Sequence, residues 1–290
     1  MEVKSSADSA SGSEITNTHL VKSIRVEGLV ADYFQGVLGK PREALILLGG
    51  SEGGKSWSDH QAHIWEFVEL GYAVLSLAYF GEEGLPARLS AIPLEYFSKA
   101  FCWFSSQKEV IPDKYTLLGV SRGAELALLL GSVFPKVKAV VAIAPSSVVF
   151  PGSPKGILDA LRGQHSAWSL QGQEIQFVPL PYSLITLHGM ITGMRTRMFE
   201  EALRKSNAVE KAAIPVEKIQ GPILLESFTR DQIWPSTFMA GQLVDRLTSS
   251  GFRYSFKHNA HDTTHSNWSF APCWTSILAF LREHNALALP

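Results

Sequence analysis

The chain has 290 residues, of which 46% are hydrophobic and 18% are charged, and its formal net charge is −1. This size and apolar content allow a large buried core, either in one domain with an insertion or in two compact domains. The near-neutral charge, without a Lys/Arg stripe, excludes the basic field typical of nucleic-acid-binding and polybasic membrane-binding proteins. Cys102 and Cys273 are too few for a disulfide framework and fit a reducing compartment, so we expect a cytoplasmic protein.

The first 18 residues are rich in serine and small polar side chains and contain no apolar segment of the kind found in signal peptides. We therefore expect residues 1–18 to be a disordered lead-in. No uncharged apolar stretch reaches the roughly 18 residues that a membrane span needs. Residues 19–290 are then expected to form a single domain.

From residue 20 onwards the chain follows a repeating pattern. Alternating apolar residues around Gly28 predict an opening β-hairpin over 20–36. Short apolar runs then alternate with helix-like segments, which predicts an α/β fold with a mostly parallel central sheet and helices on both faces. The expected strands are 44–48, 72–78, 115–118, 139–143, 222–226 and, more weakly, 254–256. The expected helices are 57–70, 93–106, 122–134, 236–250 and 272–285.

The alternation stops between about residues 150 and 220. This region contains five prolines, two glycine-containing turns and a helical pattern around 196–208. It predicts a cap or lid insertion over one end of the sheet, where it would face the substrate. Its apolar side chains could contact an acyl chain and its cations a phosphate, but for any single residue we favour core packing and a solvated helix face, respectively. The apolar candidates are Trp168, Phe177, Leu180, Tyr182, Leu184, Ile191 and Met194, and the cationic ones are Arg195, Arg197 and Lys205.

The sequence GVSRG at 119–123 matches the G-x-S-x-G nucleophile elbow. An expected strand precedes it and an apolar helix follows, as the motif requires. The tight turn would raise the Ser121 hydroxyl above the sheet, beside the amide of Arg122, which could stabilise an oxyanion.

A serine nucleophile needs a base, and the elbow motif predicts an acid and then a histidine later in the chain. Asp231 follows the expected strand 222–226, and a segment with three histidines follows 254–256. A histidine from that segment could bridge Ser121 and Asp231. The spacing of His258, His261 and His265, together with Asp262, also leaves a metal site open as an alternative.

Residues 49–56 read GGSEGGKS and match the phosphate-binding pattern G-x-x-x-x-G-K-[ST]. A nucleotide site of this type also needs an aspartate at the end of a second strand, and strands 72–78 and 139–143 do not end in one. The loop after an early central strand supplies the second oxyanion amide in α/β-hydrolases, and its glycines allow close backbone approach. We favour this second interpretation over the nucleotide site.

Several longer segments resemble a known family. The segments are GGSEGG, AYFGEEGLP, GVSRGAELAL, SAWSLQGQEIQFVP, AIPVEKIQGPILL and DQIWPS. Together they resemble the C-terminal catalytic domain of acyl-CoA thioester hydrolases and bile acid-CoA:amino acid N-acyltransferases, most closely the bacterial, dienelactone-hydrolase-like members. The resemblance runs from about residue 20 to the C-terminus.

This resemblance implies an α/β-hydrolase fold with a Ser–Asp–His triad. By motif position the nucleophile is Ser121, the acid is Asp231 and the base is His261, with His265 as the alternative base. The oxyanion amides would be those of Arg122 and of Glu52 or Gly53.

The chain departs from the family's pattern in four ways. We expect it to lack room for the family's N-terminal β-sandwich domain, and it carries serine where the acyltransferase branch has cysteine. Arg230-Asp231 stands where the family usually has a pair of aspartates, and the segment around the base reads Asn259-Ala260-His261.

Together these features predict a serine hydrolase that cleaves a small-molecule ester or acyl thioester through an acyl-serine intermediate. We expect no cofactor, no metal, no nucleic acid partner and no membrane span. The alternatives are an acyltransferase or cyclase with the same triad and a nucleotide-binding protein.

Overall fold

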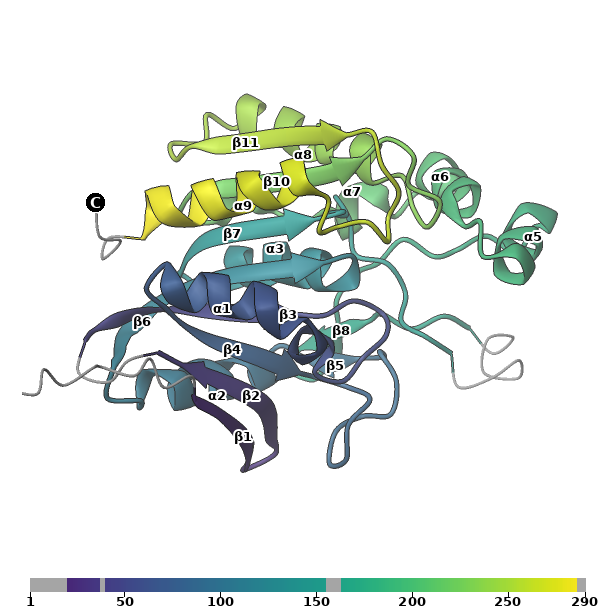
Figure 1. Cartoon of the computed structure of the whole chain (residues 1–290). Coiled ribbons are helices and arrows are strands. Elements are labelled where there is room, and N and C mark those ends of the chain that lie inside the picture. The colour runs from purple at the N-terminus through teal and green to yellow at the C-terminus, as the bar shows by residue number, and fades with distance from the viewer. Residues whose placement is uncertain (1–19, 37–39, 155–162, 286–290) are drawn as a thin grey trace, which may run out of the picture.

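The computed structural model describes residues 20–36, 40–154 and 163–285, and its centre is a sheet of eight strands (Figure 1). The first three strands in space are antiparallel, and the remaining neighbours are parallel. The expected lead-in at 1–18 lies outside the described residues. In spatial order the strands are β1 (Leu20–Val26), β2 (Leu29–Gln35), β4 (Tyr72–Ala78), β3 (Arg42–Leu48), β6 (Val110–Val120), β7 (Val137–Ile143), β10 (Ile223–Phe228) and β11 (Phe256–His261).

Helices cover both faces of this sheet. One face packs on α1 (Gln61–Glu69), which follows the short 3-10 helix η1 (Ser56–His60), and on α9 (Ala271–His284). The other face packs on α2 (Glu95–Ser105), α3 (Arg122–Val133) and α8 (Ser236–Ser249). The central strands β3 and β4 are buried along their whole length because both of their faces are covered. The expected α/β fold with a mostly parallel sheet is confirmed, as is the hairpin β1–β2.

The last strand differs from the expectation. It was expected at 254–256, with a loop over 257–265, but β11 pairs with β10 from Phe256 as far as His261. Its sequence is largely polar, which fits its place at the edge of the sheet, where none of its residues is fully buried. The ladder of backbone hydrogen bonds to β10 extends the strand through this polar stretch, so His261 ends a strand and His265 lies in the loop that follows.

The region between residues 150 and 220 forms several small elements. A second, three-stranded sheet joins β5 (Ile92–Pro93) to β8 (Trp168–Leu170) and β9 (Gln173–Glu174). Helices α5 (Leu184–Thr192) and α6 (Thr196–Lys205) project beyond the carboxyl ends of the central strands (Figure 1). Helix α7 (Val209–Ala212) and the 3-10 helix η2 (Val216–Lys218) lead back to β10.

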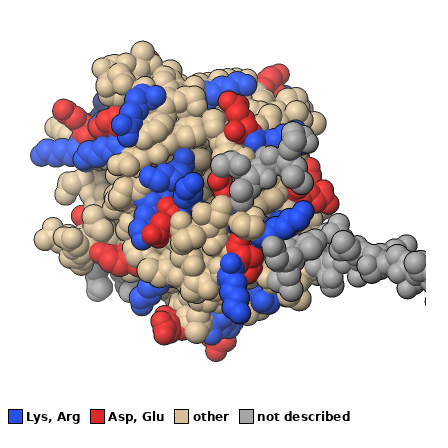
Figure 2. Space-filling model, turned by 90° about the vertical axis from the view of Figure 1, so that its left-hand side faces the viewer, with Lys and Arg blue, Asp and Glu red and all other residues tan. Residues whose placement is uncertain are grey.

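The surface carries charges of both signs. On the face shown in Figure 2, Lys and Arg side chains alternate with Asp and Glu. None of the helices in the described ranges is both long and apolar enough to cross a bilayer.

Candidate active site

Ser121 lies between β6 and α3, in a backbone conformation that is rare for a residue with a side chain. Its φ is +57° and its ψ is −117°. Such a conformation costs on the order of 1–3 kcal/mol and persists only where the surroundings enforce it. The Ser121 amide donates to the carbonyl of Ile143 on β7, and its carbonyl accepts from the amides of Ala124 and Glu125. These bonds hold the strand-to-helix turn that the motif predicted.

The two glycines of the motif allow close backbone contacts. A Cβ atom on Gly119 would lie 2.0 Å from the carbonyl oxygen of Gly123, and one on Gly123 would lie 2.2 Å from that of Leu48 on β3. Because these neighbours are backbone atoms, they cannot turn aside as a side chain could. The glycines therefore let α3 start directly against β6 and β3. The amide of Arg122 heads α3, where the first N–H groups have no acceptor within the helix.

The Arg122 side chain points away from the site. It donates to the buried carboxylate of Glu125 at 2.8 Å and to the carbonyls of Phe150 and Pro151. The other carboxylate oxygen of Glu125 accepts from the indole N–H of Trp168 at 2.7 Å. Burial raises the pKa of Glu125 to about 7, in spite of the adjacent guanidinium. This buried network beneath the Ser121 turn was not predicted, and it places Trp168 in the core and not against a substrate.

Asp231 lies in the turn after β10, and its carboxylate is held on several sides. Oδ1 accepts from the amides of Ile233 and Trp234, and Oδ2 accepts from the hydroxyl of Ser236 at 2.7 Å. The side chain is almost fully buried. A buried carboxylate with these donors has a fixed orientation.

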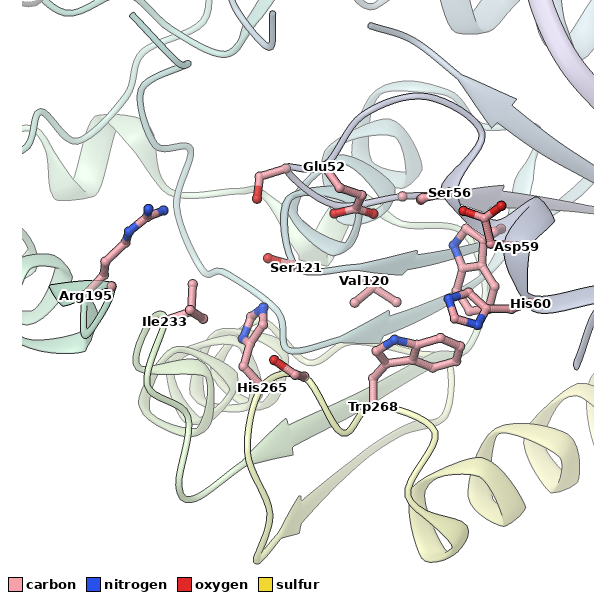
Figure 3. Close-up of a pocket in the computed structure, with 15 residues that line it drawn as sticks. Glu52, Ser56, Asp59, His60, Val120, Ser121, Arg195, Ile233, His265 and Trp268 are labelled. Atoms are coloured by element: carbon pink, nitrogen blue, oxygen red, sulfur yellow. The ribbon is translucent and has the colours of Figure 1, made fainter. Parts of the chain in front are cut away.

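His265 is the imidazole that meets this carboxylate. Its Nδ1 atom lies 2.8 Å from Oδ2 and 3.0 Å from Oδ1 of Asp231. A hydrogen bond at Nδ1 leaves Nε2 as the second functional nitrogen of the ring. In Figure 3 the His265 ring points towards Ser121 across the same pocket.

His261, to which the family resemblance assigned the base, bonds to a different carboxylate. Its Nε2 lies 2.5 Å from Oε2 of Glu226, and no hydrogen bond to Asp231 is formed. Asn259 and His261 lie on the same side of β11, and in the parallel register Glu226 is the partner of Asn259. Both side chains therefore reach the fully buried Glu226, and Asn259 also donates to Ser276 on α9. The expected pairing of His261 with Asp231 does not occur in the structure.

The three histidines do not converge on a common point. His258 is bonded to the hydroxyl of Ser227, while His261 and His265 bond to the separate carboxylates described above. Burial lowers the pKa of His258, followed by the influence of nearby His261. The proposed metal site of these three residues with Asp262 is therefore not formed. Among the described residues, Glu226, His261 and Cys273 lie close enough to share an ion, and Glu226 and His261 already bond to each other.

The glycine-rich loop 49–56 follows β3 and borders the Ser121 pocket. The carboxylate of Glu52 turns back and accepts from the amide of Gly50 at 2.7 Å, so this amide is not free to bind a phosphate. Lys55 forms an ion pair with Asp32 at 2.7 Å. Both contacts oppose the nucleotide-binding interpretation. Glu52 lines the pocket beside Ser121, whereas Gly53, with φ +74°, packs against the ring of Phe80 and is not among the lining residues.

The pocket around Ser121 has a volume of about 490 Å³ (Figure 3). At one end it is bordered by Arg195 and Ile233. At the other end the rings of Trp57 and Trp268 pack 4.8 Å apart, with His60 against Trp268. The aromatic end was not predicted, since its residues come from two segments that are far apart in sequence and carry no motif. Of the cations proposed in the insertion, Arg195 lines this pocket.

Comparisons with known proteins agree with this architecture. A model of the family described as "BAAT / Acyl-CoA thioester hydrolase C terminal" matches residues 92–266. An acyl-coenzyme A amino acid N-acyltransferase 2 of Rattus norvegicus is 29% identical over 247 residues, which cover 82% of this chain and 53% of the relative. The mitochondrial acyl-coenzyme A thioesterase 2 of Mus musculus is 29% identical over 62% of this chain and 36% of its own length. The chain thus spans about half, or less, of the curated relatives that it matches.

Solved structures with the same architecture include esterases. One from Pyrococcus furiosus superposes with a TM-score of 0.58 at 14% identity, covering 92% of this chain and 93% of the esterase. Another, from Pyrobaculum calidifontis, has a TM-score of 0.55 at 17% identity, covering 91% of this chain and 85% of the other. At such low identity these neighbours establish the α/β-hydrolase fold alone. Because the family model matches more than half of the sequence, the chain belongs to the BAAT/acyl-CoA thioester hydrolase C-terminal family.

Proposed function

We propose that the protein is a serine hydrolase that cleaves an ester or acyl thioester, with Ser121 as nucleophile, His265 as base and Asp231 as acid. The observation that carries this proposal is the placement of the Asp231–His265 pair and the strained Ser121 turn around one pocket. Membership of a family with thioesterase and acyltransferase members supports the same reaction class. His265 replaces His261 in this assignment because it bonds to Asp231.

The reaction follows from these positions. The imidazole of His265 takes the proton of the Ser121 hydroxyl as Oγ attacks the carbonyl carbon, and Asp231 stabilises the imidazolium and fixes its tautomer. The amide of Arg122, together with an amide of the Ser51–Glu52 turn, would donate to the oxyanion. His265 then returns the proton to the departing thiol or alcohol, which leaves an acyl-serine. Water, deprotonated by His265, attacks the acyl-serine and releases the carboxylic acid.

Ser121→Ala tests this proposal. We expect a fluorophosphonate to label the native protein and not the variant, and hydrolysis of p-nitrophenyl esters and acyl-CoAs to fall by on the order of 10⁴-fold or more. Ser132→Ala, which removes a part-buried hydroxyl near the C-terminal end of α3, serves as the matched control. Full esterase turnover by Ser121→Ala would disprove the assignment.

Acyl transfer is the second candidate, because the relative that matches 82% of this chain is an N-acyltransferase. The same acyl-serine would then be attacked by the amine of an amino acid in place of water. Product analysis of acyl-CoA turnover with and without an added amino acid separates the two: an N-acyl amino acid supports transfer, and free acid as the sole product supports hydrolysis.

A further inference from the structure

Arg195 gives the Ser121 pocket a positive charge at one end. Among the described residues that line this pocket, Arg195 is the one lysine or arginine. It is exposed and forms no ion pair with any residue in the described ranges. In Figure 3 Arg195 and Asp59 lie at opposite ends of the pocket, with Ser121 between them. The guanidinium is therefore available to bind an anionic group that enters the pocket.

The backbone of Arg195 is fixed to the turn that carries the proposed acid. The amides of Arg195 and Thr196 both donate to the carbonyl of Gln232, at 2.8 and 3.3 Å. The hydroxyl of Thr196 donates to the carbonyl of Asp231 at 2.8 Å, and the carboxylate of Asp231 bonds to His265. These bonds join the start of α6 to the proposed catalytic pair. The Arg195 side chain therefore begins at a fixed point next to the reacting centre.

The acidic side chains of the pocket determine which end an anion would occupy. Glu52 and Asp59 both line the pocket. The Glu52 carboxylate lies close to the nucleophile, since a Cβ placed on Gly50 would lie 2.7 Å from its Oε2 atom and 3.4 Å from the Cβ of Ser121. In Figure 3 both carboxylates lie on the far side of Ser121 from Arg195. They repel a negative group from that side, while the guanidinium attracts it to the other, and both effects are stronger in a partly enclosed pocket than in bulk water.

We propose that Arg195 is a specificity residue that binds a carboxylate of the substrate, near the scissile carbonyl. This inference rests on the proposed hydrolase function and adds the substrate class, an ester or thioester that also carries a carboxylate. A carboxylate matches the forked guanidinium through two parallel hydrogen bonds. Arg195 and Ser121 line one pocket of about 490 Å³, so the carboxylate and the scissile carbonyl can be bound together. The phosphates of coenzyme A fit this position less well, because the whole pantetheine arm separates them from the thioester.

Pairs of esters with and without a carboxylate test the inference. Mono-p-nitrophenyl adipate carries the carboxylate on the acyl part and is compared with p-nitrophenyl hexanoate. 4-Carboxyphenyl hexanoate carries it on the leaving group and is compared with phenyl hexanoate. For at least one pair we expect Arg195→Gln to lower the ratio of kcat/KM, acidic over neutral ester, by at least about tenfold, mainly through KM. Arg195→Lys, which keeps the charge, should recover part of this ratio. Arg197→Gln is the matched control, because Arg197 is exposed on the same helix and does not line the pocket, and it should keep the native ratio.

Titration calorimetry on Ser121→Ala separates this inference from the proposed function, because binding needs no turnover. We expect monoethyl adipate to bind Ser121→Ala at least about tenfold more tightly than Ser121→Ala combined with Arg195→Gln. Such a difference in a protein that hydrolyses no ester would support the carboxylate site and refute the hydrolase alone. The inference is overturned if ester hydrolysis is found but both ratios are equal in the native protein and Arg195→Gln, or if Arg197→Gln lowers them as much. It is also overturned if Arg195→Gln impairs hexanoyl-CoA alone, since Arg195 would then bind a phosphate of the carrier.

Discussion

His261 and His265 lie four residues apart, yet each bonds to a different carboxylate. His265 bonds to Asp231, beside the Ser121 pocket, while His261 bonds to Glu226 inside the sheet. The family motif alone points to His261. The sequence gives no sign that β11 extends through its polar residues as far as His261, so it does not reveal that this histidine bonds to Glu226. The proposed acid, Asp231, and the proposed nucleophile, Ser121, by contrast follow from local pattern, since each comes shortly after an apolar strand. The sequence therefore predicted which types of side chain surround the pocket, whereas the register of β11 on β10 determines which of the two histidines can bond to Asp231.

The two histidines should respond differently to substitution. We expect His265→Ala to lower kcat by on the order of 10⁴-fold or more, because Ser121 loses its base, with little change in the free energy of unfolding. We expect His261→Ala to destabilise the protein by about 3 kcal/mol, because the buried Glu226 carboxylate loses a partner, while kcat of the folded protein falls by about tenfold or less.

His261→Gln, which keeps an N–H donor, should recover part of the lost stability. Urea unfolding and esterase assays on the same preparations measure both quantities. Loss of activity in His261→Ala as complete as in His265→Ala, at equal stability, would assign the base to His261 after all.

At the scale of elements, the start of α3 depends on its contact with β3. Gly123→Ala would place a Cβ 2.2 Å from the carbonyl oxygen of Leu48 and 2.4 Å from that of Gly49, so the helix would have to move away from the strand. We expect the protein to be destabilised by at least about 2 kcal/mol and activity to fall steeply, because the Arg122 amide moves with the helix.

Gly241→Ala in the middle of α8 is the matched control, since nothing lies within 4 Å of its Cβ position. It should stabilise the protein by about 0.5–1 kcal/mol. Equal effects of the two substitutions on the urea midpoint would contradict the packing argument.

The buried Glu125 links α3 to β8 through Trp168 and should make stability depend on pH. Its pKa is raised to about 7 from an ordinary value of 4.5, so between these values the folded state holds a proton that the unfolded state has released. Its contribution is therefore favourable near pH 4.5 and is lost as the pH rises to about 7. Glu125→Gln should remove up to about 3 kcal/mol of this pH dependence while keeping an acceptor for Trp168. The measurement is the free energy of unfolding in urea from pH 5 to 8, and identical slopes in the two proteins would refute the assignment.

At the scale of the whole molecule, the order of strands and helices in the central sheet was predictable. Between residues 150 and 220 the helical pattern around 196–208 predicted α6, while the other small elements were not predicted. Strands buried on both faces leave long apolar runs, and the helices between them keep an apolar periodicity. The short strands β5 and β8 lie some 75 residues apart in sequence and carry two or three residues each, so no local pattern reveals their pairing. The same limit applies to the pocket, whose aromatic end joins Trp57 with Trp268.

The two cysteines report on the integrity of this core. Cys102 is exposed on α2, whereas Cys273 on α9 is fully buried against the sheet, and burial together with Glu226 raises the pKa of its thiol. Since the thiolate is the reactive form, we expect an aromatic disulfide reagent to modify one thiol rapidly in the native protein and two in denaturant. In Cys102→Ser the remaining thiol should react only as fast as the molecule unfolds, because α9 has to leave the sheet before the reagent can enter. A rate in native buffer close to that of a free thiol would mean that α9 does not close this face of the sheet.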